Sequence, residues 1–289
     1  MSSIDLISPK ETAQSQLSPG LYIVATPIGN LRDITLRALE VLHGADRILA
    51  EDTRQSLKLL QNYKIETPLT AYHDHNVAKM LPKVMEWLDQ DLVVAQISDA
   101  GTPLVSDPGY KLVRAAIDKG HKVVPLPGAS ASLAALVAAG LPSDRFLFAG
   151  FLANKTKARQ AALSELKPVK STLIFFESPK RVEKSLVDIL AILGNRPAVL
   201  ARELTKKFEE VRRGNVEELI EQCRNDPPRG EIVLVIGPPE GGEKWDEDVL
   251  DKALVDLLPD VGAKRASAEL AEISGWSKRD IYQRALTLK

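Results

Sequence analysis

The chain has 289 residues, of which 44% are hydrophobic and 27% are charged, and its formal net charge is -1. This composition excludes a disordered chain and has the length of about two folded domains. The single cysteine, Cys223, excludes an intrachain disulfide and a cysteine-based zinc finger, and it favours a reducing compartment. No signal peptide is visible, and the longest small, apolar stretch, 129–141, is shorter than the roughly 20 residues that span a membrane. We therefore expect a soluble, cytoplasmic protein with a polar, mobile tail over residues 1–19.

Residues 20–142 predict an α/β domain with a mostly parallel sheet. Near-continuous apolar segments alternate with helical patterns, as in βαβ units whose strands are buried on both faces. The expected strands are 21–25, 46–50, 92–97 and 122–126, and the expected helices are 34–44, 53–61, 76–89 and 110–119. Turn-forming residues after Gly140 place the domain boundary between 142 and 143.

Residues 143–238 predict a second α/β domain. Its strands are closer together along the chain, which indicates a mixed sheet with some antiparallel pairing. The expected strands are 146–151, 171–177, 197–203, 207–214 and 231–237, and the expected helices are 155–166, 179–193 and 215–224. The composition of residues 238–244 is that of a hinge.

Residues 245–289 predict a small helical module. Helical periods at 250–258 and 264–274 are separated by a turn at 259–262, and Ser277 can cap a third helix at 278–286. The last two helices resemble a helix-turn-helix whose second helix opens with Lys278 and Arg279. Residues 261–289 hold six bases and three acids, which favours docking on nucleic acid. A helical lid that stabilises a dimer is the alternative.

Small and polar residues follow each of the four strands expected in the first domain. These loops cover residues 26–35, 51–54, 98–109 and 127–131. Ligands of open α/β sheets bind beyond the carboxyl ends of the strands, so we expect the four loops to share one ligand site. A single loop of this kind would more often do no more than end a strand.

Several familiar site motifs are absent from the sequence. It contains no P-loop, no dinucleotide fingerprint, no metal-ligand spacing and no nucleophile elbow. His73 and His75 are the only close histidine pair, and a solvated turn explains them more simply than a metal site. We therefore expect no metal, and a small organic cofactor held by backbone groups and a few carboxylates.

Charge is distributed unevenly along the chain. Residues 151–213 hold fourteen Lys or Arg against seven Asp or Glu. Such a segment indicates an anionic partner, although a solvated helix face explains many charge runs equally well.

Seven segments resemble, in order, the family of bacterial 16S ribosomal RNA (cytidine-2′-O)-methyltransferases, which has the tetrapyrrole-methylase fold. They are TPIGNLRDITLRALEVL, AEDTR, SDAGTPLVSDPG, PLPGASA, FFESPKR, ARELTKKFEEVRRG and GEIVLVIGP. The resemblance covers residues 20–238, and the family carries a similar C-terminal segment. It implies S-adenosylmethionine in a cleft between two α/β domains, a homodimer, and methylation of a cytidine ribose in the decoding region of 16S rRNA in the small ribosomal subunit.

The same resemblance implies the residues that contact the cofactor. Matched motif by motif, they are Pro27, Asp99, Ala100, Gly101, Thr102, Pro103, Val105, Ser130, Ala131 and Glu177. Thr102 departs from the relatives that act on tetrapyrroles, which carry Asp before the proline. This difference disfavours a tetrapyrrole substrate.

Ribose methylation is an in-line displacement that a general base assists, because a sugar hydroxyl is a poor nucleophile. At the ligand edge, Glu51 and Asp52 are candidate bases. Candidates for positioning the hydroxyl or a phosphate are Asn30, Arg54 and Lys206. A structural role is the alternative for each, since Glu51 and Arg54 are also placed to cap the helix at 53–61 and form its ion pair.

RNA binding would explain the excess of basic residues in 151–213. Expected phosphate contacts are Lys180, Arg181, Lys207, Arg212 and Arg213, with Lys278 and Arg279 in the module. Aromatic residues make up only 5% of the chain, which favours recognition of assembled shape over base stacking. A small-molecule methyltransferase would not need this basic surface, and a non-enzymatic RNA-binding protein would not need the four loops.

Overall fold

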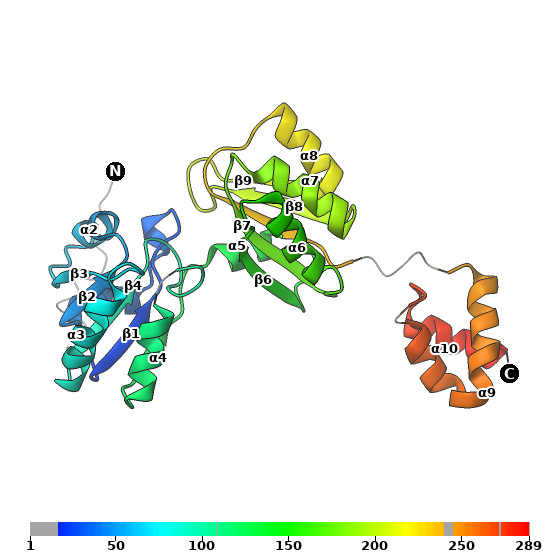
Figure 1. Cartoon of the computed structure of the whole chain (residues 1–289), viewed down its shortest axis with the longest axis horizontal. Helices are drawn as coiled ribbons and strands as arrows, with labels where there is room; N and C mark the ends of the chain where they lie inside the picture. The colour runs from blue at the N-terminus through cyan, green and yellow to red at the C-terminus, as the bar shows by residue number, and fades with distance from the viewer. Residues whose placement is uncertain (1–16, 108, 240–244, 272, 289) are drawn as a thin grey trace.

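The structure is a computed structural model that describes residues 17–107, 109–239, 245–271 and 273–288. Two α/β domains, each with a five-stranded sheet, are followed by a helical module (Figure 1). The predicted tail lies almost wholly outside the described residues, as does most of the predicted hinge. None of the helices in the described ranges is long and apolar enough to cross a membrane.

The first sheet is entirely parallel, where the sequence predicts a mostly parallel one. Its order is β3-β2-β4-β1-β5. The strands are β1 (Gly20–Val24), β2 (Arg47–Ala50), β3 (Leu69–Ala71), β4 (Val93–Ile97) and β5 (Val123–Leu126). The short strand β3 was not among the predicted strands. Because all strands run in one direction, the loops after β1, β2, β4 and β5 emerge at one edge.

Helices cover both faces of this sheet. They are α1 (Leu36–Gly44), α2 (Thr53–Asn62), α3 (Val77–Asp89) and α4 (Tyr110–Asp118), with a 3-10 turn at Leu31–Asp33. Successive residues of β1 point to opposite faces, so that Leu21 and Tyr22 lie in two different apolar clusters. Side-chain caps begin two of the helices close after a loop: Thr35 accepts the N–H of Ala38, and Asp52 accepts that of Arg54.

The second sheet is mixed, as predicted. Its order is β6-β7-β10-β8-β9, with β6 and β7 parallel and the other pairs antiparallel. The strands are β6 (Phe146–Phe151), β7 (Thr172–Glu177), β8 (Pro197–Arg202), β9 (Glu210–Asn215) and β10 (Ile232–Ile236). The helices α6 (Thr156–Leu166), α7 (Val182–Leu193) and α8 (Val216–Asn225) enclose a core with Leu173 and Leu234 of the sheet.

Helix α5 (Ala131–Ala139) covers the other face of the second sheet and was not predicted. Ala135 and Ala139 pack against Ile174 and Val235. By packing, α5 therefore belongs with the second domain, although it precedes the boundary predicted between 142 and 143. The turn residues at that point connect α5 to β6 and do not separate two cores.

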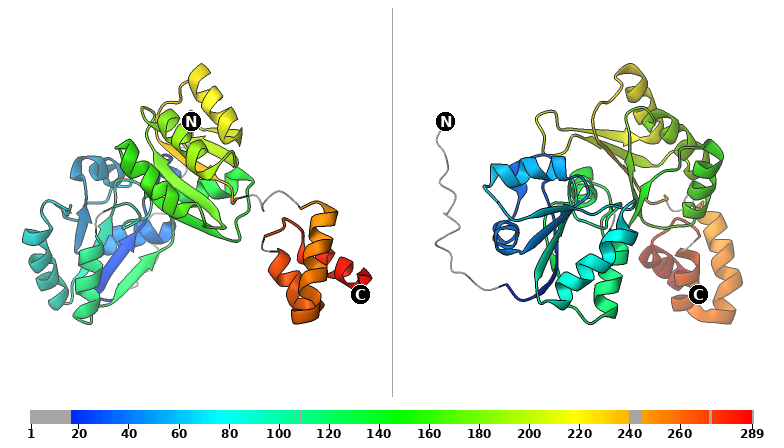
Figure 2. Two further views of the ribbon diagram at one scale, coloured as in Figure 1. Left: turned by 45° about the vertical axis from the view of Figure 1, so that its right-hand side comes forward. Right: turned by 60° about the vertical axis from the view of Figure 1, so that its left-hand side comes forward.

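The helical module has its own core. Helix α9 (Glu247–Ala271) is interrupted at Gly262, whose φ of +73° is not helical, and α10 (Lys278–Thr287) starts after the Ser277 cap. The break falls on the last residue of the turn predicted at 259–262, while residues 259–261 continue the helix. Figure 1 and the left view of Figure 2 show α9 and α10 packed against each other and apart from both sheets.

Candidate functional site

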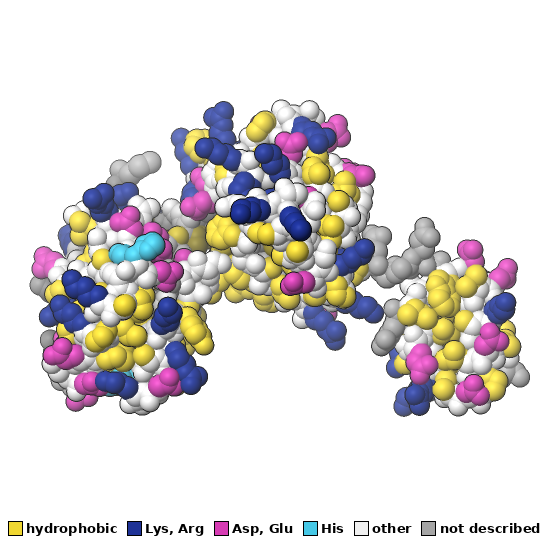
Figure 3. All heavy atoms as spheres, viewed as in Figure 1, with side chains coloured by type: hydrophobic (Ala, Val, Ile, Leu, Met, Phe, Trp, Pro, Cys, Tyr) yellow, Lys and Arg dark blue, Asp and Glu magenta, His cyan; other side chains and the backbone are white. Residues whose placement is uncertain are grey.

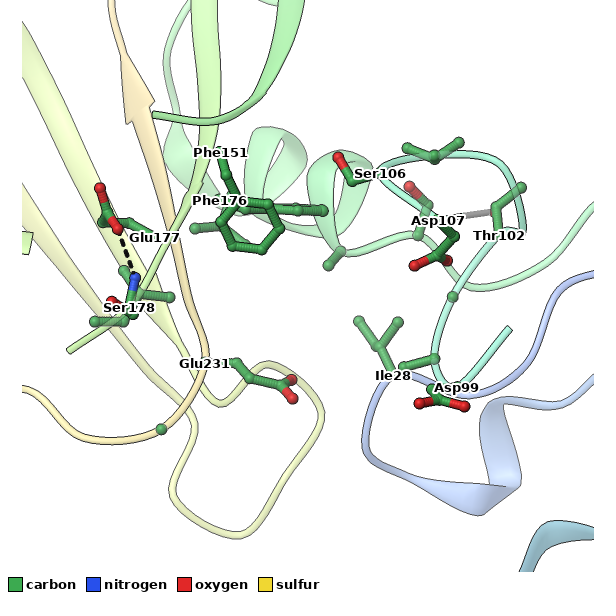
Figure 4. Close-up of a pocket in the computed structure, with 18 of the residues that line it drawn as sticks. Ile28, Asp99, Thr102, Ser106, Asp107, Phe151, Phe176, Glu177, Ser178 and Glu231 are labelled. Atoms are coloured by element: carbon green, nitrogen blue, oxygen red, sulfur yellow. Dashed lines mark hydrogen bonds between the residues drawn. The ribbon is translucent and has the colours of Figure 1, made fainter. Parts of the chain in front are cut away.

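A pocket of about 370 Å³ lies between the two α/β domains, within the range of about 300–1,000 Å³ usual for small-molecule sites. In Figure 4, Ile28, Asp99, Thr102, Ser106 and Asp107 form one side, and Phe151, Phe176, Glu177, Ser178 and Glu231 face them from the second domain. The remaining lining residues are Ala100, Gly101, Val105, Ser130, Ala131, Pro179, Gly230, Ile232 and Val233.

Backbone pairing fixes the floor of the pocket. The N–H of Thr26 donates to the carbonyl of Gly101 at 2.8 Å, and the N–H of Gly101 donates back at 2.9 Å. Gly101 has a φ of +79°, and a Cβ placed on it would lie 3.3 Å from Ile28 Cγ2. Glycine is therefore needed both for the turn and to keep the backbone open to a ligand.

The rest of the loop after β4 follows an unusual path. Leu104 and Ser106 have φ values of 72° and 65°, a conformation that costs an L-residue about 1–3 kcal/mol. At Gly109, whose φ is +132°, a Cβ would lie 2.1 Å from Gln96 Nε2, so a larger residue would be strained and would have to displace the Gln96 side chain. This path brings Ser106 and Asp107 into the pocket wall.

The structure brings together most of the residues predicted to contact the cofactor. Eight of the ten line the pocket, whereas Pro27 and Pro103 are buried and do not line it. The small side chains of Ala100, Gly101 and Ala131 leave backbone groups accessible. Contact of these residues with the cofactor stays a prediction.

Glu177 contributes to the wall, but its carboxylate is used within the second domain. It accepts the backbone N–H of Ser178 at 2.9 Å and the hydroxyl of Ser185 at 2.5 Å. Arg181 Nε lies 3.3 Å from Glu177 Oε1. The residue is only 3% exposed, so these bonds satisfy a buried charge.

None of the five predicted catalytic residues lines the pocket. Asp52 caps α2 by accepting the Arg54 N–H at 2.8 Å, so the cap is Asp52 and not Glu51. Asn30 accepts the N–H of Arg32 at 3.1 Å. Lys206 Nζ lies 2.9 Å from Glu203 Oε1 and 3.0 Å from Glu231 Oε2. The catalytic roles stay predictions.

Carboxylates gather at this edge of the first sheet. Burial raises the pKa of Asp107 to about 6, with further increases from Glu51 and Asp99 and an opposing hydrogen bond to Ser98. Burial also raises the pKa of Glu51, with Asp99 adding to the effect. Asp107 lies in the predicted loop 98–109 but was not among the predicted site residues. The only signal was its position after a strand at the ligand edge.

The basic residues predicted to contact RNA fall into two groups. Lys180, Lys207 and Arg213 are exposed, although Arg213 also donates to the carbonyl of Ala138. Lys278 and Arg279 at the start of α10 are exposed as well. Figure 3 shows Lys and Arg side chains gathered on one face of the second α/β domain.

Arg212 and Arg181 form internal contacts instead. Arg212 is 9% exposed, and its guanidinium binds the carboxylates of Glu210 and Asp226. Besides its ion pair with Glu177, Arg181 donates to the carbonyl of Leu152. The donors of Arg212 are used within the second domain, and its contact with RNA stays a prediction.

The histidine pair lies in the loop after β3. The His73 and His75 rings are 6.0 Å apart. Within the described ranges, no group of three or more His, Cys, Asp or Glu side chains is arranged to hold a metal ion.

Solved structures share this two-sheet architecture. Cobalt precorrin-4 methyltransferase matches with a TM-score of 0.58 at 19% identity, over 75% of this chain and 94% of that one. Uroporphyrin-III-C-methyltransferase from Thermus thermophilus matches with a TM-score of 0.54 at 22% identity, over 75% of this chain and 93% of that one. Diphthine synthase matches with a TM-score of 0.59 at 16% identity, over 75% of this chain and 89% of that one. The fold is therefore that of the tetrapyrrole methylases.

Sequence comparison is more specific. The model of the tetrapyrrole (corrin/porphyrin) methylases matches residues 20–220, and that of the RsmI C-terminal HTH domain matches 243–289. Ribosomal RNA small subunit methyltransferase I of Mesorhizobium japonicum is 51% identical over 98% of this chain and 97% of that protein. Its counterparts in Escherichia coli O157:H7 and Bacillus subtilis are 48% and 43% identical, over 92% and 91% of this chain and 94% and 92% of those proteins.

The chain belongs to the tetrapyrrole methylase family, in the group of ribosomal RNA small subunit methyltransferases I. It is therefore an S-adenosylmethionine-dependent methyltransferase. The pocket fits this cofactor chemically: it offers backbone groups beside small residues and a lining that is rich in carboxylates, which suits a ligand with a sulfonium and an amine.

Proposed function

We propose that this protein transfers a methyl group from S-adenosylmethionine to the ribose 2′-hydroxyl of a cytidine in 16S rRNA of the small ribosomal subunit. The observation that carries the proposal is the 43–51% identity, over nearly the whole chain, to ribosomal RNA small subunit methyltransferases I. This identity extends through both α/β domains and the C-terminal module.

The residues of the first domain hold the cofactor in this proposal. Backbone groups of residues 99–102 and 130–131 contact it, and Phe151 and Phe176 close the opposite side. The cofactor supplies an electrophilic methyl group on a sulfonium. The protein orients a hydroxyl toward that group and excludes water, and orientation of this kind contributes up to about 7–11 kcal/mol.

RNA reaches the pocket along the second domain. Ser178 and Pro179 line the pocket, and the exposed Lys180 follows them directly. Lys207 and Arg213 extend the basic surface. These side chains contact phosphates and position the RNA without reading its sequence.

A small-molecule substrate is the alternative that the fold allows. The tetrapyrrole-acting structures cover 75% of this chain and more than nine-tenths of their own length. The helical module at 243–289 is therefore an addition to that fold. It favours a macromolecular substrate, in agreement with Thr102 at the position where tetrapyrrole-acting relatives carry Asp.

The protein acts as a homodimer in the cytoplasm in this proposal. Large apolar side chains of the second domain remain exposed in the single chain, among them Leu133 and Val137 of α5 and Phe146 of the edge strand β6. Val137 is 79% exposed. Covering these side chains with a second copy would remove apolar surface from water, and sedimentation tests this state directly.

Transfer of a labelled methyl group tests the function. Radiolabelled S-adenosylmethionine is incubated with the protein and small ribosomal subunits whose 16S rRNA lacks the modification. Label in a 2′-O-methylcytidine after nuclease digestion supports the proposal. Label in a base, in a ribosomal protein or in a small-molecule fraction contradicts it.

A further inference from the structure

Four carboxylates line the pocket in the part of the chain that the structure describes: Asp99, Asp107, Glu177 and Glu231. Three of them form hydrogen bonds or ion pairs with neighbouring residues. Asp99 Oδ1 accepts the backbone N–H of Asp52 at 3.0 Å. Glu177 is bound by Ser178, Ser185 and Arg181, and Glu231 pairs with Lys206.

Asp107 differs from these three. Within the described ranges it forms no ion pair, and Ser98 is the neighbouring side chain that lowers its pKa. The acids Glu51, from the loop after β2, and Asp99, from its own loop, act on it and disfavour its charged form. In the loop after β3, Asp74 raises the pKa of Glu51 and His73 lowers it. On the facing wall, Glu231 is neutralised by Lys206.

We propose that the Asp107 carboxylate accepts the proton of the substrate hydroxyl during methyl transfer. This inference rests on the proposed function, because it assigns the base of that reaction. The hydroxyl oxygen forms a bond to the methyl carbon, the carbon–sulfur bond breaks, and its electron pair stays on sulfur. The hydroxyl proton moves to Asp107 and is later released to water.

The charges around Asp107 suit this sequence of events. Next to a bound sulfonium, the ionised form of Asp107 is favoured, so the base is ready before transfer. When the positive charge is lost, Glu51 and Asp99 again favour the protonated form. A group whose pKa is about 6 is also close to the optimum for a base that works near neutral pH.

This assignment replaces Glu51 and Asp52 as candidate bases. Asp52 is engaged as the cap of α2, and neither residue lines the pocket. Glu51 acts through Asp107 by raising its proton affinity, which makes Glu51 a positioning residue. Replacing Glu51 with Gln should therefore move the pH dependence of the reaction to lower pH and leave the base in place.

Single-turnover methyl transfer to small ribosomal subunits tests the role of Asp107. With the wild-type protein, we expect the rate to fall as the pH drops below about 6. Asp107→Asn should lower the rate at least about 100-fold and remove this pH dependence. Asp118→Asn, a surface carboxylate change outside the pocket, serves as control and should leave both unchanged.

A second measurement is independent of turnover. Calorimetric titration at about pH 6, in buffers with different ionisation enthalpies, counts the protons released on ligand binding. S-adenosylmethionine should release a fraction of a proton from the wild type, and the uncharged product S-adenosylhomocysteine clearly less. Asp107→Asn should abolish this difference while it binds both ligands within about threefold of wild-type affinity.

The outcomes separate the two proposals. If the wild type methylates the small subunit and Asp107→Asn does so at a similar rate, the inference fails and the proposed function stands. If Asp107→Asn loses activity in proportion to its loss of cofactor affinity, Asp107 is a cofactor ligand and the inference fails. If the wild type labels no 16S rRNA, the proposed function fails, and the inference about its base fails with it. In that case the calorimetric proton count shows only whether Asp107 changes its protonation when the ligand binds.

Discussion

Arg181 Nε lies 3.3 Å from Glu177 Oε1, so a basic residue of the predicted RNA surface is tied into the wall of the pocket. The Glu177 side chain is buried and also accepts the Ser185 hydroxyl. Lys180, one residue earlier, is exposed. Two neighbouring basic residues therefore serve different purposes.

Charge reversal separates these purposes. Lys180→Glu should leave cofactor affinity and stability unchanged, weaken RNA binding, and reduce the slope of log affinity against log salt by about 1. Arg181→Glu should lower the free energy of unfolding by about 3 kcal/mol, because it leaves Glu177 buried beside a second carboxylate. Urea denaturation and filter binding at several salt concentrations check both. Equal effects of the two changes on stability would contradict this division.

The sequence predicts the layers of the fold because burial on both faces leaves continuous apolar strands and turns punctuate them. It fails for β3, which has three residues and half-buried side chains, too short a segment to show a pattern. It also fails for α5, which is apolar on nearly every side. Ala135 and Ala139 are buried against the second sheet, while Leu133 and Val137 are exposed, so no amphipathic period is visible.

The candidate site was predicted as far as strand order determines it. Parallel strands bring the loops after β1, β4 and β5 to one edge, which placed most of the pocket residues. The roles of charged residues depend on partners far away in sequence. The contact of Arg212 with Asp226 and that of Lys206 with Glu231 exist only in the folded chain. For the same reason, Asp107 gave no signal of its own.

Gly101 tests whether the loop after β4 contacts the cofactor. Gly101→Val should lower the affinity for S-adenosylmethionine at least tenfold, because the new side chain points into the pocket floor near Ile28. Gly120→Val is a matched control: its φ of +81° resembles the +79° of Gly101, but nothing lies within 4 Å of its Cβ. Both variants should lose similar stability. Unchanged calorimetric affinity in folded Gly101→Val would remove this loop from the site.

Asp107 also predicts a pH-dependent stability. Its pKa rises from 3.8 in the unfolded chain to about 6 in the fold, so the folded state binds more protons between these values. The contribution of this group to stability is therefore fully present below about pH 4 and is lost as the pH rises through 6. Asp107→Asn should be more stable than the wild type at about pH 7.5, and its advantage should disappear toward pH 4. Urea denaturation across this range checks the trend, and a difference independent of pH would contradict it.

The helical module should raise affinity for the ribosomal substrate without taking part in methyl transfer. At its surface, Arg284 binds Asp251 and Glu247. The indole N–H of Trp276 donates to the carbonyl of Trp245 at 2.6 Å. Arg284 is thus structural, which leaves Lys278 and Arg279 at the exposed start of α10 to contact phosphates.

A chain ended after Pro239 should keep its affinity for S-adenosylmethionine and raise the KM for small ribosomal subunits at least tenfold, with kcat little changed, because a second docking site raises the local concentration of substrate. The pair Lys278→Glu and Arg279→Glu should reproduce most of this effect in the full chain. Lys252→Glu, on the acidic first half of α9, is the matched control. Unchanged methylation by the shortened chain at limiting substrate would show that the module does not dock. A shortened chain that sediments as a monomer, while the full chain is a dimer, would instead make the module a lid that stabilises the dimer.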